Sequence, residues 1–372
     1  MTSPLDFFMP QLQEPPNYEE SLPNFENAYI CANISQLCYL SSVNAKRMDI
    51  GYEEAVRSTL KNWGCSQQDA QKTFFIESDK ITNEDGTFVS GTEGLIIFHD
   101  KTVIIGFRGS EKKPDDWGAN FKIRARPFDF GEGKVHRGFV SAFKAIVPYS
   151  GPNVSKFEDV INNIKNAQSI WLTGHSLGGA LAIVAANYLV HKKINVSGVY
   201  SFGAPRVGNG TYRNYVNEKL TYKYWRFMYE NDIVPDLPPP GLIYRYSREG
   251  CMLRLNKTGD TQEFDVLRRV NAEGKRIRLA SYRGISVDDH SISNYSDRLF
   301  DLVRQNDKDF PRMEFETLSD DGKLNGLYPG VAAFQKRAIF SLLEQNVAVE
   351  IIAKGLQVDP KIVQNIKDSL DE

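Results

Sequence analysis

The sequence predicts an α/β protein whose sheet has parallel strands at its centre. From about residue 154 onward, apolar runs of strand length alternate with stretches of helix length, which is the pattern of repeated β–α units. A small-residue turn joins one such run, 169–174, directly to an alanine-rich helix, 176–190. Hydrophobic residues make up 41% and charged residues 25% of the 372-residue chain, a composition typical of globular rather than disordered proteins.

The charge balance and the cysteines exclude several classes of protein. Lys plus Arg total 45 and Asp plus Glu total 47, so the net charge of −2 argues against nucleic-acid binding through bulk positive charge. No apolar run reaches the ~18 residues of a membrane-spanning helix, and the N-terminus lacks the features of a secretion signal. Cys31 and Cys38, on one predicted helix, lie ~10 Å apart, too far for a disulfide. We expect a cytoplasmic protein, with signal-less export left open, whose four cysteines are reduced and which holds no metal or cofactor.

Before residue 110 the sequence predicts an arm, two helices and a β-hairpin. Residues 1–20 contain four prolines and predict a Pro-rich, flexible arm. The PPNY sequence at 15–18 has the PPxY form that WW-type modules bind, but a solvated leader is the simpler interpretation of so short a match. Two apolar strands, 94–98 and 102–108, form the hairpin.

The remaining elements complete a main domain over 21–305, followed by a linker and a tail. The linker, 306–330, is polar and contains Gly and Pro, and the tail, 331–372, regains helical periodicity. The five basic and six acidic residues of the tail favour docking to a protein over nucleic-acid binding. The elements predicted in the second half of the main domain are helix 154–166, strand 169–174, helix 176–190, strand 196–202, helix 209–219, strand 222–229 and a closing helix at 291–305.

The first indication of a catalytic site is the sequence GHSLG at residues 174–178. It has the form G-x-S-x-G and lies between an apolar strand and a helix, which places Ser176 on a sharp turn. Gly174 and Gly178 are the glycines of this nucleophile elbow, because Cβ atoms two residues to either side of the serine would collide. The turn also exposes the hydroxyl of Ser176 beside the free N–H groups of a helix N-terminus. We predict that Ser176 is a nucleophile; an ordinary turn of a β–α unit is the alternative.

A nucleophilic serine needs a base, and the five histidines of the chain allow elimination. In enzymes built on such a turn the three groups follow in the order nucleophile, acid, base. Three of the histidines precede Ser176, and His191 lies ~22 Å away at the far end of the helix that begins at the serine. His290, in a polar loop just ahead of the closing helix, is therefore the predicted base.

The acid should follow a strand of the same sheet, because the carboxyl ends of parallel strands meet at one edge. Strand 222–229 is followed by Asp232, which we predict to be the acid that orients the imidazole. Glu230 and Asp236, in the same loop, are the runners-up.

Acyl transfer also requires hydrogen-bond donors for the negative charge that develops on the carbonyl oxygen. One predicted donor is the backbone N–H of Leu177, directly after the nucleophile. The second should come from a loop after an earlier strand, and Ser110, which ends the sequence FRGS after strand 102–108, supplies it. A plain turn at these positions is the alternative.

Seven short motifs follow one another between residue 104 and about residue 295. They are IIGFRGS (104–110), DDW (115–117), VHRGF (135–139), LTGHSLGGALA (172–182), FGAPRVGN (202–209), ENDIVPDLPP (230–239) and DDHS (288–291). In these motifs the chain resembles the class 3 lipase family, the fungal-type triacylglycerol lipases and their bacterial relatives. The resemblance implies an α/β-hydrolase fold with a mostly parallel sheet flanked by helices. It also implies a triad of Ser176, Asp232 and His290 and an oxyanion hole at Ser110 and Leu177, the assignment reached above.

The same resemblance implies a lid over residues 111–126 and structural roles beside the site for His136 and Arg206. The lid segment is mostly polar and basic, and Trp117 and Phe121 are among its few bulky apolar residues. We therefore expect weak activation of the protein at an oil–water interface.

Together these features predict a serine hydrolase that cleaves carboxylic esters of lipids through an acyl-enzyme intermediate. Its expected partners are a lipid or small ester substrate and, transiently, a membrane surface or a lipid droplet. A phospholipase A or an acyltransferase would use the same triad. A non-catalytic protein that binds partners through its tail or its PPNY sequence is a third alternative, against which the complete set of site residues argues.

Overall fold

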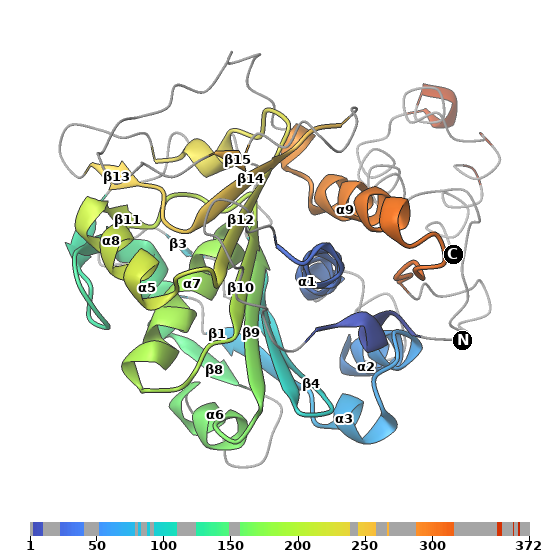
Figure 1. The fold of residues 1–372 in the computed structure, drawn as a ribbon, viewed down its shortest axis with the longest axis horizontal. Coiled ribbons are helices and arrows are strands. Elements are labelled where there is room, and N and C mark those ends of the chain that lie inside the picture. The colour runs from blue at the N-terminus through green and yellow to red at the C-terminus, as the bar shows by residue number, and fades with distance from the viewer. Residues whose placement is uncertain are drawn as a thin grey trace.

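A mixed β-sheet with helices on both faces lies at the centre of the computed structural model (Figure 1). The structure describes residues 3–9, 23–40, 52–78, 81–82, 88–89, 93–109, 124–148, 157–238, 245–257, 266–267, 288–315 and 348–351, and the single residues 360 and 364. The strands of the central sheet, within these residues, are β1 (Phe74–Ser78), β4 (Glu93–His99), β5 (Thr102–Phe107), β8 (Ile146–Pro148), β9 (Ser169–His175), β10 (Gly198–Phe202), β12 (Tyr224–Tyr229), β14 (Cys251–Leu255) and β15 (Val266–Leu267).

The strand order of this sheet is β15-β14-β12-β10-β9-β5-β4-β1-β8. The strands from β5 to β14 in this order run parallel, whereas β4, β1 and β8 at one end and β15 at the other pair antiparallel to their neighbours. The predicted α/β-hydrolase architecture, with a mostly parallel sheet, is therefore confirmed. Because the carboxyl ends of β9 and β12 lie at the same edge, the residues that follow these strands come together there.

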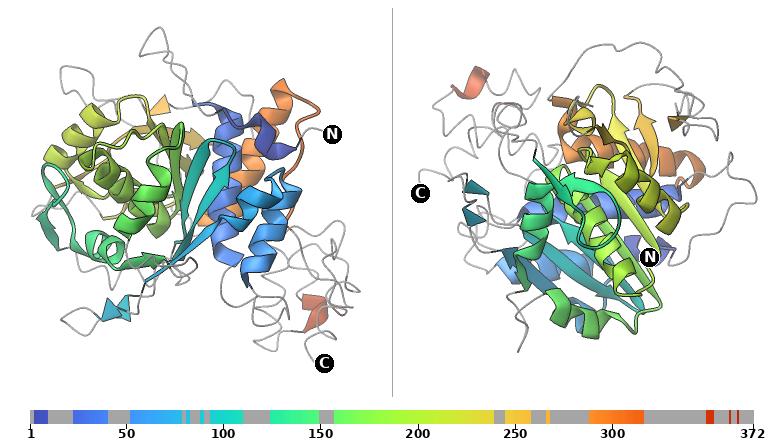
Figure 2. Two further views of the ribbon diagram at one scale, coloured as in Figure 1. Left: turned by 90° about the horizontal axis from the view of Figure 1, so that it is seen from below. Right: turned by 90° about the vertical axis from the view of Figure 1, so that its left-hand side faces the viewer.

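The helices form one layer on each face of the sheet (Figure 2). One layer contains α1 (Phe25–Leu37), α2 (Tyr52–Asn62), α3 (Gln67–Gln71) and α9 (Ile292–Asn306); the other contains α5 (Arg137–Lys144), α6 (Phe157–Ile164), α7 (Leu177–His191) and α8 (Gly210–Lys219). Successive residues of β9 point to opposite faces, so Trp171 joins the core under α1 while Leu172 joins the core under α7. Burial on both faces explains why these strands are apolar along their whole length.

Smaller elements surround the sheet. The short strands β6 (Ala125–Pro127), β7 (Lys134–His136), β11 (Gly208–Asn209) and β13 (Tyr246–Ser247) form a second sheet, and β2 (Ile81–Thr82) pairs with β3 (Phe88–Val89). Four single turns of 3₁₀ helix are described, namely η1 (Pro4–Phe7), η2 (Cys38–Leu40), η3 (Val234–Asp236) and η4 (Asp288–His290). The last two carry the loops that enter the site described below.

The predicted hairpin corresponds to β4 and β5, and the predicted alternation corresponds to the elements from α6 to β12. The sequence did not predict β1, α5 or β14. Each of them is eight residues or shorter, and so short a segment shows little periodicity by which a helix or a strand could be recognised.

The first residues of the chain are not a flexible arm throughout, and for residues 3–9 that prediction is wrong. Leu5 and Phe8 are buried, and the ring of Phe8 packs edge-on against Trp171 of β9 at a centroid distance of 5.2 Å. The side chain of Asn27 fixes the main chain at Met9, accepting its N–H and donating to its carbonyl, both at 2.8 Å. Burial of two large apolar side chains outweighs the extended preference of the prolines. The PPNY sequence at 15–18 lies outside the described residues.

The predicted linker is likewise wrong over its first ten residues, 306–315. Phe310 and Met313 are almost fully buried in the core that α1 and α9 share. The hydroxyl of Tyr29 accepts the N–H of Met313 at 2.8 Å, and the indole N–H of Trp63 donates to the carbonyl of Glu314 at 2.7 Å. The main domain therefore extends at least to residue 315, because apolar side chains placed among polar ones in this stretch find partners on the N-terminal helices.

All four cysteines are free, and Cys31, Cys38 and Cys65 are buried. Among the described residues, no helix is both long enough and apolar enough to cross a membrane. Most of the predicted tail, 331–372, lies outside the described residues.

Candidate active site

Ser176 forms the turn between β9 and α7 and adopts backbone angles of φ 58° and ψ −126°. A positive φ is uncommon for a residue with a side chain and indicates a strained turn. The turn closes only because its flanking residues lack side chains: a Cβ atom at Gly174 would overlap the carbonyl group of Gly178, and one at Gly178 would overlap the carbonyl group of Phe107. Ser176 is thereby held at the carboxyl end of β9, where α7 begins.

Two backbone segments border the nucleophile turn. Leu177 is the first residue of α7, and the N–H groups of a first helical turn have no partner within the helix. On the other side, a Cβ atom at Gly109 would lie 3.0 Å from the Cβ atom of Ser176 and 2.7 Å from the carbonyl oxygen of His175. The loop after β5 therefore touches the turn, as the oxyanion-hole prediction requires. Ser110 itself lies outside the described residues, as do Trp117 and Phe121 of the predicted lid.

His290 and Asp232 form a buried pair although 58 residues separate them. The Nδ1 atom of His290, in η4, lies 2.8 Å from Oδ2 of Asp232. Asp232 is fully buried and His290 is only 7% exposed. Because a carboxylate oxygen only accepts, Nδ1 carries the proton, and Nε2 of the neutral ring is left as an acceptor. Gly203, with φ 59°, gives the pair its space: a Cβ atom there would lie 2.8 Å from Asp232 Oδ2 and 2.9 Å from His290 Nδ1.

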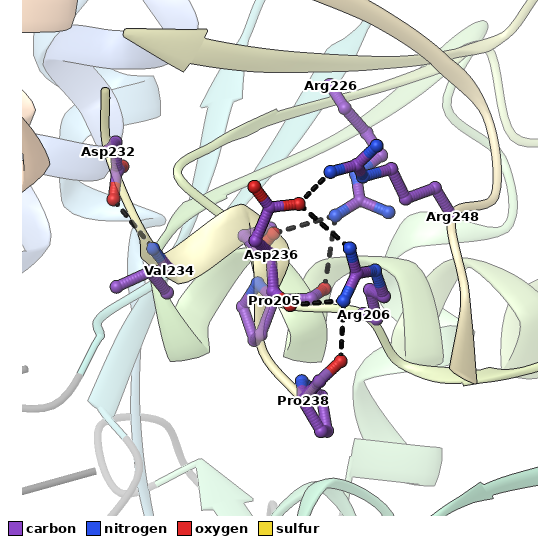
Figure 3. A network of polar contacts seen from close by, with 9 residues as sticks. Pro205, Arg206, Arg226, Asp232, Val234, Asp236, Pro238 and Arg248 are labelled. Atoms are coloured by element: carbon purple, nitrogen blue, oxygen red, sulfur yellow. Dashed lines mark hydrogen bonds and ion pairs between the residues drawn. The ribbon is translucent and has the colours of Figure 1, made fainter. Parts of the chain in front are cut away.

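Tyr295 of α9 is a further member of this cluster that the sequence did not predict. Its hydroxyl donates to Oδ2 of Asp232, the same oxygen that receives the Nδ1–H of His290. Burial raises the pKa of Tyr295 well above its ordinary value, so the hydroxyl keeps its proton and acts as a donor. The other carboxylate oxygen accepts the N–H of Val234 at 2.9 Å (Figure 3). Asp232 thus receives hydrogen bonds from His290, Tyr295 and Val234. The only sequence signal for Tyr295 is its place on the buried face of the closing helix.

The two runner-up carboxylates have other partners. Asp236 forms ion pairs with Arg206, at 2.8 Å, and with Arg248 (Figure 3). Glu230 accepts the backbone N–H of Lys257. Of the three carboxylates in this loop, Asp232 is the one that meets the histidine.

Two arginines, Arg206 and Arg226, hold the loops that follow Gly203 and Asp232 through hydrogen bonds to main-chain carbonyl groups. Arg206 donates to the carbonyl oxygens of Asp236 and Pro238, the latter at 2.7 Å (Figure 3). Fully buried Arg226 donates to the carbonyl oxygen of Ala204 at 2.7 Å and pairs with the buried carboxylate of Glu249 at 3.3 Å. These contacts fix the main chain that follows Gly203 and the main chain that follows Asp232.

His136, which the family resemblance implied to be structural, packs its ring on Phe139 at a centroid distance of 4.5 Å. Within the part of the chain that the structure describes, no three His, Cys, Asp or Glu side chains are grouped so that they could hold a metal ion.

The imidazole of His175 joins the nucleophile turn to the histidine loop. Its Nε2 atom lies 2.6 Å from the carbonyl oxygen of His290, and its Nδ1 atom lies 2.7 Å from the hydroxyl of Tyr39. The two imidazole rings are 4.5 Å apart between centroids. Burial, and then the nearby ring of His290, lower the pKa of His175 well below its ordinary value, so this ring is neutral.

Residues 104–242 match the sequence profile of the family described as Lipase (class 3). A secreted mono- and diacylglycerol lipase from Fusarium solani is 33% identical over 148 residues, which are 40% of this chain and 42% of that protein. A lipase from Rhizomucor miehei is 31% identical over 241 residues, 60% of this chain and 63% of that protein. A phospholipase A1 from Oryza sativa is 29% identical over 187 residues, 45% of this chain and 46% of that protein.

The chain spans about half the length of the curated relatives it matches. The segment that matches the family contains the loop after β5, the turn at Ser176, the glycine at 203 and the loop at Asp232. His290 and Tyr295, the other members of the cluster, follow it in the chain. Over this segment the chain is similar to the class 3 lipase family.

Proposed function

We propose that this protein is a serine hydrolase that cleaves carboxylic esters of lipids, with Ser176 as nucleophile, His290 as base and Asp232 as the acid that orients the base. The single observation that carries the proposal is the buried hydrogen bond between His290 Nδ1 and Asp232 Oδ2, 2.8 Å long, beside a serine on a strained turn. Triad chemistry needs a histidine whose Nδ1 is held by a carboxylate and whose Nε2 is free to accept a proton.

The reaction follows from these roles. Nε2 of His290 takes the proton of the Ser176 hydroxyl while the oxygen attacks the carbonyl carbon of the ester. The negative charge that forms on the carbonyl oxygen is stabilised by the N–H of Leu177 and by a donor at Ser110. The tetrahedral intermediate collapses, and the alcohol leaves with the proton from His290. Water then attacks the acyl-enzyme by the same route and releases the acid and the free serine.

Asp232 keeps the imidazole in its productive tautomer and stabilises the positive charge that the ring acquires in each step. Its three donors, from His290, Tyr295 and Val234, satisfy the oxygens of the buried carboxylate and fix its orientation.

Lipid esters are the proposed substrates because the relatives carry the names of lipases and of a phospholipase A1. The rice phospholipase A1 supports phospholipid hydrolysis as the second candidate, since the triad would be the same. An acyltransferase would differ only in replacing water by another hydroxyl compound. Transient contact with a membrane surface or a lipid droplet is the way in which such substrates would reach the site, and protein docking through the C-terminal tail remains a separate proposal.

The test combines a fluorophosphonate probe with a substrate panel of p-nitrophenyl esters, triacylglycerols and phospholipids. The native protein should be labelled and should hydrolyse at least one class of ester. Ser176→Ala should abolish labelling, and Ser176→Ala and His290→Ala should each lower kcat by on the order of 10⁴-fold or more, because triad members act as a unit. Absence of labelling and of turnover in the native protein would favour the non-catalytic alternative.

We further propose a cytoplasmic location. The four cysteines, all within the described residues, form no disulfide, which fits a reducing compartment where thiols stay reduced. Fractionation of cells that produce the tagged chain tests this, and recovery of the chain mainly in the medium would contradict it.

A further inference from the structure

We propose that His175, oriented by Tyr39, is a positioning residue that holds the main chain of His290 and thereby aims its imidazole at Ser176. This inference rests on the proposed function and deepens it, because it adds to the triad a second attachment point for the base. His175 is the residue before the nucleophile, yet its ring reaches a residue 115 positions further along the chain.

The hydrogen bonds of His175 are fixed in direction. A carbonyl oxygen only accepts, so the bond of 2.6 Å to His290 requires a proton on Nε2 of His175. In the neutral ring Nδ1 is then an acceptor, and the hydroxyl of Tyr39, 2.7 Å away, is its donor. The bond from Tyr39 therefore selects the tautomer of His175 that can hold His290. The buried site, in which His175 is 5% exposed, keeps water from replacing either partner.

The base is then attached at two places. Asp232 holds its side chain through Nδ1, and His175 holds its main chain through the carbonyl oxygen. With only the first attachment, the imidazole could pivot about the carboxylate and carry its Nε2 away from the serine. The ring of His175 also packs against that of His290, tilted by 37° with the centroids 4.5 Å apart, which limits the same pivot. A displacement of 1 Å between reacting groups costs about 10²-fold in rate.

Tyr39 connects this attachment to the loop after β5. A Cβ atom at Gly109 would overlap the hydroxyl of Tyr39, so the hydroxyl lies directly against the backbone that leads to Ser110. The partly buried hydroxyl group of Tyr39 thus contacts the loop of His290, through His175, and also the predicted oxyanion loop. Tyr39 comes from η2, at the end of α1, which gives this N-terminal layer a part in the geometry of the site.

The experiment compares three variants with the native protein and with a control. His175→Gln keeps an N–H donor near the position of Nε2, His175→Leu removes every donor at similar size, and Tyr39→Phe removes only the hydroxyl. Tyr215→Phe is the matched control, because Tyr215 lies on α8 and its hydroxyl donates to the carbonyl of Phe130, which is not part of the cluster. Each protein is assayed for kcat and KM on a soluble ester, for its rate of labelling by a fluorophosphonate and for its melting temperature.

His175→Leu should lower kcat and the labelling rate by about 10²-fold with KM unchanged, because only the approach of base and nucleophile is impaired. His175→Gln should recover most of that loss. Tyr39→Phe should lower kcat by roughly threefold to tenfold, the effect of one neutral hydrogen bond, and Tyr215→Phe should match the native rate.

Equal losses in His175→Gln and His175→Leu would overturn the proposal, since packing alone would then explain them. Native kcat in a folded His175→Leu would overturn it as well. If His175→Leu does not fold, Tyr39→Phe decides: a native rate in that variant rejects the proposal, and the expected loss supports it. Failure of the proposed function would be recognised separately, because the native protein would neither hydrolyse esters nor take the label at Ser176.

Discussion

At the residue scale, the hydroxyl group of Tyr295 takes part in orienting the Asp232–His290 pair. Tyr295 and His290 donate to one oxygen of Asp232, so they compete for its negative charge. A carboxylate that loses one of two donors binds the other more strongly, which makes this tyrosine a modulator of the base rather than a simple packing residue.

Tyr295→Phe should therefore move the acid limb of the kcat/KM pH profile to higher pH. Without the tyrosine, Asp232 stabilises the protonated ring of His290 more strongly, and the active, neutral form is reached only at higher pH. We expect a shift of roughly half to one pH unit, since one unit corresponds to about 1.4 kcal/mol. The profile is measured on a soluble ester, with Tyr215→Phe as the control, and an unchanged or lowered limb would contradict the competition.

His175 makes a second prediction at this scale, because burial lowers its pKa well below the ordinary value. Below about pH 6.5 the unfolded chain binds a proton at this residue and the folded chain does not. The folded state therefore loses stability on acidification, at about 1.4 kcal/mol per pH unit, until the pH reaches the pKa of the folded state. Urea unfolding between about pH 7 and pH 5 should give a free energy of unfolding that falls more steeply for the native protein than for His175→Gln. Parallel slopes would show that His175 is charged in the folded protein.

At the scale of elements, the parallel strands β9, β10 and β12 end at the same edge of the sheet. Ser176, Gly203 and Asp232 follow these strands and therefore lie at that edge. The strands place three turns side by side, and the glycine in the middle turn leaves the space that the acid and base occupy. The turn after β10 therefore matters because Gly203 has no side chain that would occupy this space.

Gly203→Ala should lower kcat by 10²-fold or more and should also lower stability. Its Cβ atom would lie 2.8 Å from Asp232 Oδ2 and 2.9 Å from His290 Nδ1, and its φ of 59° is strained for alanine. Gly210→Ala is the control, since its Cβ atom would come no closer than 3.8 Å to Ser247 Oγ. Ester assays and melting curves of the two variants check the expectation, and similar activities would show that the pair tolerates displacement.

At the scale of the whole molecule, the two ends of the described domain both pack on α1 and its neighbours. Residues 3–9 and 307–315 bury Leu5, Phe8, Phe310 and Met313 in the same core. The rings of Phe7 and Phe310 pack against each other in a tilted arrangement, 4.7 Å between centroids, so the two end segments contact each other directly.

Truncation should therefore be tolerated after residue 322 but not after residue 306. The first truncation keeps Phe310 and Met313, whereas the second removes both, and each contributes about 1.5–3 kcal/mol when buried. We expect residues 1–322 to melt close to the full chain with full activity. Residues 1–306 should melt roughly 5–15 °C lower or fail to fold. A large drop for 1–322 would instead assign the tail to the domain.

If the proposed function holds, the predicted lid determines how the whole protein responds to an oil–water interface. A segment with as few bulky apolar residues as 111–126 exposes little hydrophobic area when it opens, so an interface offers it little free energy. Rates on short-chain esters should be comparable below and above the concentration at which the ester aggregates. A sharp rise at that concentration would identify a lid that opens at interfaces.

The sequence by itself determined the architecture of the centre and the order of its parts. Apolar runs identified β5, β9, β10 and β12 within a few residues, because a strand buried on both faces is apolar along its length. The turn at Ser176 could be predicted because it depends on glycines at a fixed, short spacing. His290 and Asp232 were reached by elimination and by the rule that parallel strands end at one edge.

Only the tertiary structure decided which side chains meet. Tyr295, Tyr39 and His175 take their places through contacts between segments 63 to 136 residues apart, and no local pattern records such contacts. The packing of Leu5 and of Phe310 was hidden for the same reason: each lies in a short stretch where prolines and charged residues interrupt the apolar ones, so that no periodicity can be recognised. Local sequence determines strands, helices and tight turns through short-range sterics, whereas the burial of an isolated side chain depends on a surface that distant segments build together.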